Sequence, residues 1–332
     1  MSKAKQNADG VLNKKLSCFN GLATMAALSL LTLAPLVAQA QVLADAPDWQ
    51  EMQQVVRAGK QQLQLNIEND SLLLNRDDRF YTSGIHLQKS FAVADQLRQT
   101  EYGWRVGQDL YTASDIKLTP AQIPVPDHPY AGWLYGGFFK TSAYATGRSI
   151  SYGLDFGCLG PCAGGKWTQE QLHHVIKQPQ PQGWSTQLKN EFGLMLHAAY
   201  APGRMLPWSG MDLTPAVKGR FGNIMTDVSA QLEWRIGQLN LLPAQDASYG
   251  FARAEPKYTA YNATVQGGYF AHQANALHAK RWGGELELGY RWQKNGSGVL
   301  VSLVRRANEI EEISNAYGAQ NFVKLQFNYA LK

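Results

Sequence analysis

The stretch that decides the fold reads DVSAQLEWRI, residues 227–236, and its apolar and polar residues alternate without a break. One face carries Val228, Ala230, Leu232, Trp234 and Ile236, and the other carries Asp227, Ser229, Gln231, Glu233 and Arg235. A period of two is typical of a β-strand whose two faces have different surroundings. The pattern recurs in residues 285–292 and 323–331, so we expect a protein built mainly of strands.

Two all-β folds are compatible with this alternation. A soluble sandwich buries its apolar face and exposes its charges, whereas a membrane barrel turns its apolar face to lipid and its polar face to the lumen. Only 17% of the 332 residues are charged, while the chain has 31 Gly, 15 Tyr and 9 Trp. This composition, with segments of about ten residues and aromatic residues near their ends, favours a barrel. No segment after the N-terminus offers the roughly 18 unbroken apolar residues of a membrane helix.

The N-terminus has the layout of a secretory signal peptide. Lysines at positions 3, 5, 14 and 15 precede an apolar run over residues 21–37, and Ala38-Gln39-Ala40 forms a small-x-small cleavage site. We therefore expect a signal over residues 1–40, an N-terminal periplasmic segment over 41–60 and a barrel over 61–332. The signal contains most of the basic excess behind the formal charge of +5, and nothing in the mature chain suggests nucleic acid.

Alternation and turn residues predict a twelve-stranded antiparallel β-barrel of the outer membrane. The expected strands cover residues 61–68, 80–92, 101–111, 130–143, 148–159, 190–201, 211–219, 223–237, 258–271, 281–293, 297–307 and 321–331. An even number with periplasmic termini places the connections 69–79, 112–129 and 160–189 on the extracellular rim. It also makes 143–147 and 294–296 tight periplasmic turns. The connection 238–257 fits poorly, because it is long for a periplasmic turn.

A short helix is expected within one of these rim connections, over Gly165 to Lys177. Thr168 is the predicted N-cap, and Gln171 three residues later completes a capping box. His173 and His174 both lie on this helix. Adjacent helical residues point in different directions, so at most one of the two should face the lumen.

The segment ENDSLLLNRDDRFYTSGIHLQ, residues 68–88, brings polar side chains to one edge of the predicted sheet. Asn69 and Asp70 end one strand and offer the hard oxygen ligands that Ca²⁺ prefers. In the next strand, alternation places Thr82 on the same face as Gly84 and His86. The segment also fits an ordinary hairpin with a solvated loop, since Asn and Asp are favoured turn residues.

Two further groups of residues lie near the rim. Cys158 and Cys162 are four apart and are compatible with a disulfide in an oxidising compartment, or with a zinc pair as the less favoured interpretation. Basic residues gather in the rim connections and suit either an anionic ligand such as a phosphorylated lipid or a solvated rim; they are Arg76, Arg79, Lys117, Lys166 and Lys177.

Six ordered blocks of this sequence together resemble the outer-membrane lipid A 3′-O-deacylase family. They are residues 68–70, 78–84, 107–112, 127 with 129–133, 160–161 and 182–184. The likeness is close over residues 60–200 and looser elsewhere. The resemblance implies a twelve-stranded barrel in the outer membrane that needs calcium and hydrolyses the 3′-linked acyloxyacyl ester of lipid A.

The resemblance also implies roles for individual residues. Calcium would bind around Asp70, with Asn69 beside it and Thr82 in the site. Counting back from the Gly183-Trp184 block makes His173 rather than His174 the base, and Lys117 is the nearest candidate for a catalytic lysine. Ca²⁺ would polarise the ester carbonyl while His173 takes a proton from water. The substrate would be lipid A in the outer leaflet, and we expect a monomer.

Two other functions are compatible with the sequence. A phospholipase of the outer membrane shares the ester chemistry but should use a serine nucleophile and often dimerises. A non-catalytic barrel, either a pore or an adhesin, needs no chemistry at the rim.

Overall fold

The structure, a computed structural model, describes residues 45–73, 80–271 and 277–331. The chain divides into two units, residues 1–46 and 47–332, and the second unit holds the barrel. The predicted signal peptide over residues 1–40 and the predicted rim residues Arg76 and Arg79 lie outside the described residues. None of the helices in the described part has the length and hydropathy to cross a membrane.

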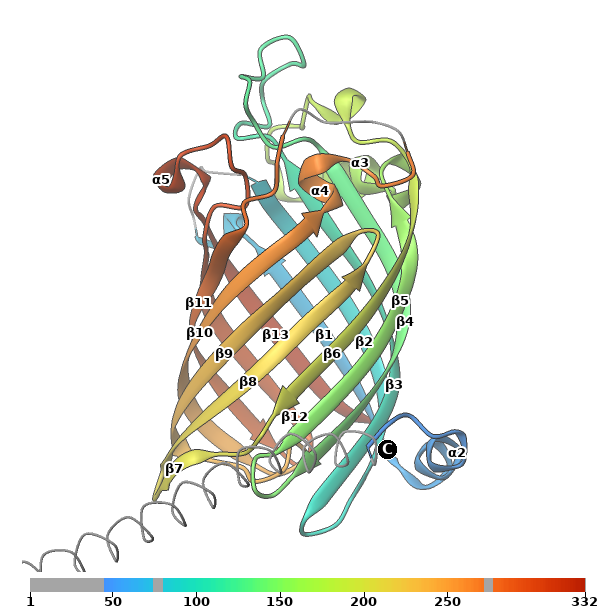
Figure 1. The fold of residues 1–332 in the computed structure, drawn as a ribbon, viewed down its shortest axis with the longest axis vertical. Helices are drawn as coiled ribbons and strands as arrows, with labels where there is room; N and C mark the ends of the chain where they lie inside the picture. Colours follow the sequence, from blue (N-terminus) through green and yellow to red (C-terminus); the bar gives the residue numbers. More distant parts are fainter. Residues whose placement is uncertain (1–44, 74–79, 272–276, 332) are drawn as a thin grey trace, which may run out of the picture. The chain divides into compact units, whose positions relative to one another are not determined.

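Twelve antiparallel strands close into a barrel, which confirms the predicted fold (Figure 1). Neighbours in sequence pair around the wall, β1 pairs with β13, and β6 pairs with β8 to complete the ring. The strands are β1 (Lys60–Asn69), β2 (Phe80–Ala94), β3 (Arg98–Thr112), β4 (Ala131–Tyr144), β5 (Ser149–Leu159), β6 (Glu191–Ala201), β8 (Met211–Gly222), β9 (Met225–Gln238), β10 (Ala247–Asn262), β11 (Trp282–Lys294), β12 (Ser297–Arg306) and β13 (Gln320–Leu331). The short β7 (Met205–Trp208) was not predicted from the sequence, and it pairs with β8.

The two ends of the barrel differ. β1 begins and β13 ends at one end, which we call the turn end because short connections such as Ala145–Arg148 close it. The other end, the loop end, carries the long connections with α3 (Gly165–Ile176), α4 (Ala263–Gln266) and α5 (Asn315–Gly318) (Figure 1). The short helices η1 (Ser71–Leu73), η2 (Pro161–Ala163) and η3 (Trp184–Thr186) also belong to the loop end.

The alternation predicted for the strands is present in the wall. Apolar side chains such as Trp104, Phe138 and Leu154 are exposed on the outer face, where a membrane would cover them. Charged side chains such as Arg105 and Asp155 come from the same strands and line the lumen. This arrangement is that of a membrane barrel and the reverse of a soluble sandwich.

The ninth predicted strand was placed wrongly. The strand was expected over 258–271, but β10 spans Ala247–Asn262, and Asn262 then caps α4 by accepting a hydrogen bond from the Thr264 amide. The alternation was hidden because the outer face of β10 has small residues such as Ala252 and Ala254, while Tyr249 and Phe251 belong to a buried cluster inside the barrel. The long connection 238–257 therefore shrinks to residues 239–246.

This connection lies across the turn end of the lumen. The Ala244 amide donates to Gln99 Oε1 of β3 at 2.8 Å, although β3 is five strands away from β9 around the ring. From the other side, Gln293 Nε2 of β11 donates to the Pro243 and Gln245 carbonyls. Arg204 adds a hydrogen bond to the Leu241 carbonyl. Residues 239–246 thus extend across the turn end, from β9 to β3 on the opposite side.

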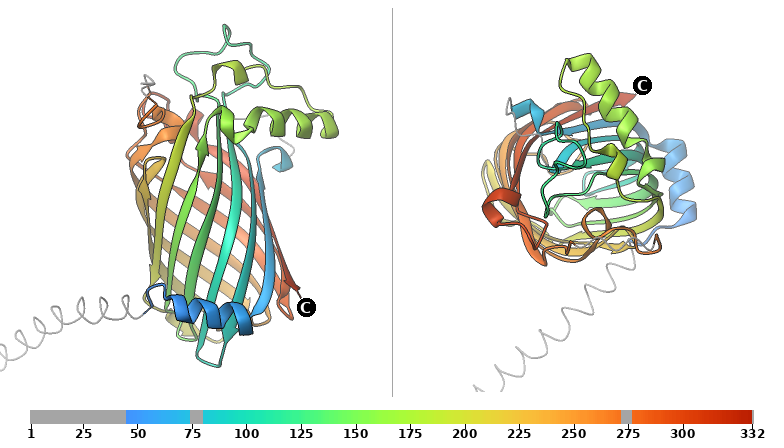
Figure 2. Two further views of the ribbon diagram at one scale, coloured as in Figure 1. Left: turned by 90° about the vertical axis from the view of Figure 1, so that its right-hand side faces the viewer. Right: turned by 90° about the horizontal axis from the view of Figure 1, so that it is seen from above.

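One helix, α2 (Trp49–Ala58), precedes the barrel and was not predicted within the 41–60 segment. Asp48 caps it by accepting from the Glu51 amide at 2.7 Å. Figure 2 shows α2 against the outside of the wall at the turn end, where it contacts β2 and β3.

Candidate functional site

The end of β1 brings Asn69 and Asp70 to the loop end. Asn69 pairs with Ser83 of β2, and its Nδ2 donates to the Thr82 carbonyl at 3.0 Å. Its Oδ1 accepts hydrogen bonds from both the amide and the hydroxyl of Ser71. Asp70 follows and is buried, with 3% of its surface exposed. The Asn69 side chain therefore fixes the turn that holds the Asp70 carboxylate.

A β-bulge places Thr82 beside this turn. The register between β2 and β3 shifts between Tyr81 and Ser83, so Tyr81 points into the lumen with His86. Strict alternation counted back from His86 would put Tyr81 on the opposite face. Thr82 is the extra residue at the bulge and is buried. Bulges often occur next to active sites because they redirect single side chains.

The loop that carries α3 is fixed at its start. Cys158 and Cys162 form a disulfide, which confirms the favoured interpretation of this pair over a zinc site. The helix begins at Gly165 with Gly164 as N-cap in the left-handed region, so the prediction of Thr168 as cap was wrong. The reason is that η2 ends in this glycine turn, which lets the helix start one turn earlier; the Thr168 amide already donates to the Gly164 carbonyl.

Close packing holds α3 against β3 and β4. A Cβ on Gly165 would lie 2.8 Å from the Trp184 ring and 2.9 Å from Leu110, so only glycine allows this approach. Leu110 lies at the same height of the barrel as Asn69, two strands away, because Asn69 pairs with Ser83 and Ser83 pairs with Leu110. Two strand spacings are roughly 10 Å. Figure 2 shows α3 at the loop end, along one side of the rim, with part of the helix extending past the wall.

His173 lies on the buried face of α3, whereas His174 is exposed. The structure therefore agrees with the expectation that at most one of them faces inward. His173 Nδ1 lies 2.6 Å from the Pro179 carbonyl oxygen. Because a carbonyl only accepts, Nδ1 must carry the hydrogen, and in the neutral ring the lone pair is on Nε2. This is the tautomer that a general base needs, held by a backbone contact.

Gln169 belongs to the same face of α3 and was not singled out from the sequence. It is 1% exposed, and its Oε1 accepts a hydrogen bond from Trp184 Nε1 at 2.7 Å. Its Nε2 is buried and has no hydrogen-bond partner within the described part of the chain. The signal that could have found it is the spacing of four to His173, which places both side chains on one side of a helix.

Lys117 is exposed on the connection between β3 and β4. Its amide donates to Asp115 Oδ1, and the carbonyl of the preceding Ile116 accepts from the Gln182 amide at 2.8 Å. Gln182 follows Pro179 in the segment that leaves α3. The structure thus joins the Lys117 loop to the His173 loop through the backbone, while Lys117 itself lies at the surface.

A layer of buried rings supports this end of the barrel. His128 stacks on Tyr111 with the ring centroids 5.3 Å apart, and its Nδ1 donates to the Pro129 carbonyl at 2.7 Å. Asp127 accepts hydrogen bonds from the amide and hydroxyl of Ser114. Burial lowers the pKa of His128, so this ring is neutral near pH 7. We therefore interpret these rings as packing that supports the loops, and not as reactive groups.

The residues suited to calcium are few. Among the described residues no group of three or more His, Cys, Asp or Glu side chains is placed to hold a metal ion. Asp70 fits as a buried hard-oxygen ligand. Asn69 Oδ1 accepts hydrogen bonds from Ser71 in this structure, so Asn69 would bind calcium directly only by giving up one of these contacts.

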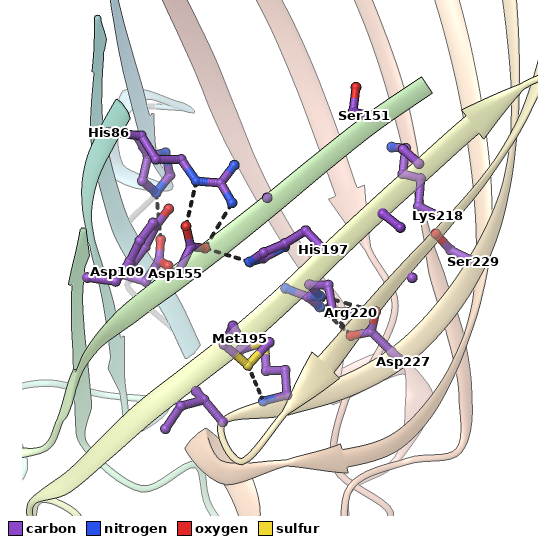
Figure 3. Close-up of a pocket in the computed structure, with 18 of the residues that line it drawn as sticks. His86, Asp109, Ser151, Asp155, Met195, His197, Lys218, Arg220, Asp227 and Ser229 are labelled. Carbon is purple, nitrogen blue, oxygen red and sulfur yellow. Dashed lines mark hydrogen bonds and ion pairs between the residues drawn. The ribbon is translucent and has the colours of Figure 1, made fainter. Parts of the chain in front are cut away.

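A second concave region is the lumen, a cavity of about 540 Å³ (Figure 3). Many of its charges are paired: His86 lies 2.8 Å from Asp109, and Asp155 receives two hydrogen bonds from Arg105 and contacts His197. Arg220 pairs with Asp227 and Lys218 with Glu255 in the same way.

Serine, histidine and aspartate all occur in this lumen, but they do not form a catalytic triad. Asp155 lies 2.5 Å from His197 Nε2, whereas the Ser151 hydroxyl bonds to Thr141 at 3.0 Å. Figure 3 shows Ser151 apart from the His197 ring. A triad needs the hydroxyl on the imidazole. The lumen is therefore a structural ion-pair network.

Comparisons with known proteins identify the family of this chain. A search of curated protein sequences finds no match. A solved structure described as LpxR from Salmonella typhimurium superposes with a TM-score of 0.67 at 18% identity, covering 81% of this chain and 100% of that chain. The β domain of the Bordetella autotransporter BrkA (TM-score 0.45, 10% identity, covering 82% and 98%) is less similar.

The translocator domain of the autotransporter NalP from Neisseria meningitidis is similarly distant (TM-score 0.41, 10% identity, covering 90% and 98%). The family model described as outer membrane protein LpxR matches residues 24–331, nearly the whole chain. This chain therefore belongs to the LpxR family of outer membrane proteins.

Proposed function

We propose that this protein is a calcium-dependent hydrolase that removes the 3′-linked acyloxyacyl chain of lipid A in the outer leaflet. Membership of the LpxR family supports a lipid A-related role in the outer membrane. The observation that carries the proposal is His173, a buried imidazole whose Nδ1 hydrogen bonds to a backbone carbonyl, at the same end of the barrel as the buried Asp70.

His173 would act as the general base. Its Nε2 takes a proton from a water molecule, whose oxygen bonds to the ester carbonyl carbon. When the carbon–oxygen bond to the sugar breaks, the same nitrogen returns the proton to the leaving 3′-oxygen, so no covalent enzyme intermediate is needed. A positioned base of this kind contributes about 10² to 10⁴ in rate.

Other side chains of the rim would stabilise and orient the ester. The Gln169 Nε2 group is a buried donor on the same face of α3 and suits an oxygen that gains negative charge. Calcium, when bound at Asp70, would supply positive charge toward that oxygen. Asn69 would hold the turn in shape through Ser71 and the Thr82 carbonyl. Lys117 is proposed to contact the substrate from the surface of its loop.

The shape of the barrel supports a loop end that faces the outside. Both barrel termini lie at the turn end, and bacterial barrels have short periplasmic turns and long extracellular loops. On α3, Trp167 and Val175 are apolar side chains that are exposed at the loop end. A lipid of the outer leaflet would then reach the rim from the side, with its acyl chains along the apolar outer wall.

The rival functions lack such support. A pore needs a continuous lumen, and residues 239–246 lie across the turn end. A serine hydrolase needs a serine on an imidazole, and Ser151 in the lumen bonds to Thr141 instead.

Mass spectrometry of lipid A from cells with and without the protein tests the proposal. We expect lipid A to lose the mass of one acyloxyacyl chain only when the protein is present. In detergent, the purified protein should act on lipid A with calcium and stop with a chelator. Hydrolysis of phospholipid but not of lipid A would instead support a phospholipase.

A further inference from the structure

The outer wall at the turn end has a groove that the proposed chemistry does not use. It is a cavity of about 960 Å³ between α2 and the barrel. From α2 it is lined by Trp49, Met52 and Val56, and from the outer faces of β3, β4 and β5 by Trp104, Phe138 and Leu154. The lining is almost wholly apolar, so it suits an acyl chain rather than a polar ligand.

Ion pairs fix α2 in the place where it bounds this groove. Lys140 of β4 is 3% exposed although it lies on the outer face, and its Nζ lies 2.5 Å from Glu51 Oε2. Glu51 also accepts hydrogen bonds from Arg98 at 3.0 Å and from the Tyr102 hydroxyl at 2.8 Å. A charged lysine facing lipid is unfavourable without a partner. These contacts therefore hold α2 against the outside of the wall, and the groove between the helix and the wall keeps its shape.

A lysine beside the groove has no acidic partner in the part of the chain that the structure describes. Lys89 lies on the outer face of β2 and pairs across the strands with Trp104. Its Nζ lies 5.6 Å from the centre of the Phe91 ring, which is nearer the turn end and also lines the groove. The side chain thus bends toward the turn end, as lysines do when they reach for the membrane surface. Within the described residues, no ion pair involves Lys89.

The last turn of α2 adds Arg57, which is exposed at the turn end just before the chain enters β1. An amphipathic helix with Trp at the membrane surface is typical of an element that lies in the headgroup region. The groove thus combines an apolar lining with basic side chains at the level of the lipid headgroups. This combination suits a phospholipid whose phosphate lies near Lys89 and whose acyl chain lies along Trp104 and Phe138.

We infer that this groove is a specific binding site for an anionic phospholipid of the leaflet at the turn end. The lipid would fill the space between α2 and the wall and bind Lys89 through its phosphate. The inference rests on the membrane position of the barrel and not on the proposed hydrolysis. It can therefore fail while the hydrolase proposal stands, and the reverse also holds.

Native mass spectrometry of the full mature chain, delipidated in detergent, tests this site. The probes are dioleoyl-phosphatidylglycerol and a phosphatidylcholine with the same acyl chains. We expect one phosphatidylglycerol to bind saturably, at concentrations where phosphatidylcholine does not. Lys89→Gln should weaken phosphatidylglycerol binding about fivefold, the effect of one basic group at a membrane surface. Lys294→Gln, which changes an exposed lysine at the end of β11, should leave binding unchanged.

A second variant tests the apolar part of the site. Trp104→Ala removes one wall of the groove and should weaken binding of phosphatidylglycerol even though Lys89 is retained. The gel mobility shift between heated and unheated samples confirms that each variant is folded. Equal binding of the two lipids, equal loss in Lys89→Gln and Lys294→Gln, or binding without saturation would each overturn the inference.

Discussion

Removing the Glu51 carboxylate should release α2 from the barrel wall. In Glu51→Ala, the helix loses an ion pair to Lys140 and hydrogen bonds from Arg98 and Tyr102. Removing one partner of a buried ion pair typically destabilises by about 3 to 5 kcal/mol. The side chain of Glu51 is 26% exposed, so solvent screening reduces this to about 2 kcal/mol for docking of the helix.

A loss of about 2 kcal/mol corresponds to about a 30-fold rise in the population of undocked helix. Hydrogen exchange of the reconstituted chain measures this directly, because local opening sets the protection of amides in α2. We expect protection over residues 52–59 to fall by about that factor, with the strands unchanged. Gln53→Ala, at an exposed position of the same helix, is the matched control. Unchanged protection in Glu51→Ala would refute the ion-pair argument.

The same contact predicts a dependence on pH. Burial raises the pKa of Glu51, but hydrogen bonds from Lys140 and Tyr102 outweigh burial and leave the pKa below its ordinary value of 4.5. A carboxylate with a lowered pKa contributes its full stabilisation above the ordinary value, and the contribution disappears as pH falls through the folded value. Protection of α2 should therefore be constant from pH 7 to 5 and fall only in stronger acid.

Three further predictions concern the loop end and the lumen. Changing Cys158 and Cys162 together to serine should lower stability by about 2 kcal/mol, because the bridge closes a short loop with a sequence separation of 4; thermal unfolding measures the loss, and an unchanged midpoint would contradict it. Burial lowers the pKa of His128 from its ordinary 6.5, so the segment 113–130 should lose stability as pH falls below 6.5 toward the folded value. The protection factors of its amides, corrected for the intrinsic exchange rate at each pH, should stay constant above pH 6.5 and fall below it. Equal protection factors at pH 7 and pH 5 would exclude a buried neutral ring. Replacing residues 239–246 by a two-residue Asn-Gly turn should raise the conductance of the barrel in planar bilayers above that of the wild type, and equal conductance would show that this connection does not close the lumen.

The strands could be predicted from sequence wherever the two faces differ in polarity. Eleven of the twelve expected segments overlap closely with the observed strands, and the exception shows why. In β10 the outer positions are small, as at Ala252, and aromatic rings such as Phe251 point inward, so the usual contrast is reversed. Pattern reasoning assigns faces by hydrophobicity, and it fails where packing inside the lumen needs large rings.

The candidate site was partly within reach of the sequence. The positions of Asp70, Thr82 and His173 at one end follow from strand order, because alternate connections of a barrel share a rim. The bulge at Thr82 could not be predicted, because an extra residue in one strand is defined by how that strand pairs with its neighbour and leaves no mark in the strand's own sequence. Gln169 was missed because its role as a buried donor depends on its contact with Trp184, which is distant in sequence.

The base on α3 offers the most direct measurement. His173→Ala and His174→Ala change adjacent histidines of the same helix, one buried and one exposed. The rate at which purified protein releases the 3′-acyloxyacyl chain from lipid A, followed by mass spectrometry, should fall by about 10² to 10⁴ in His173→Ala and stay unchanged in His174→Ala. A His173→Ala protein that retains the wild-type rate would contradict the account.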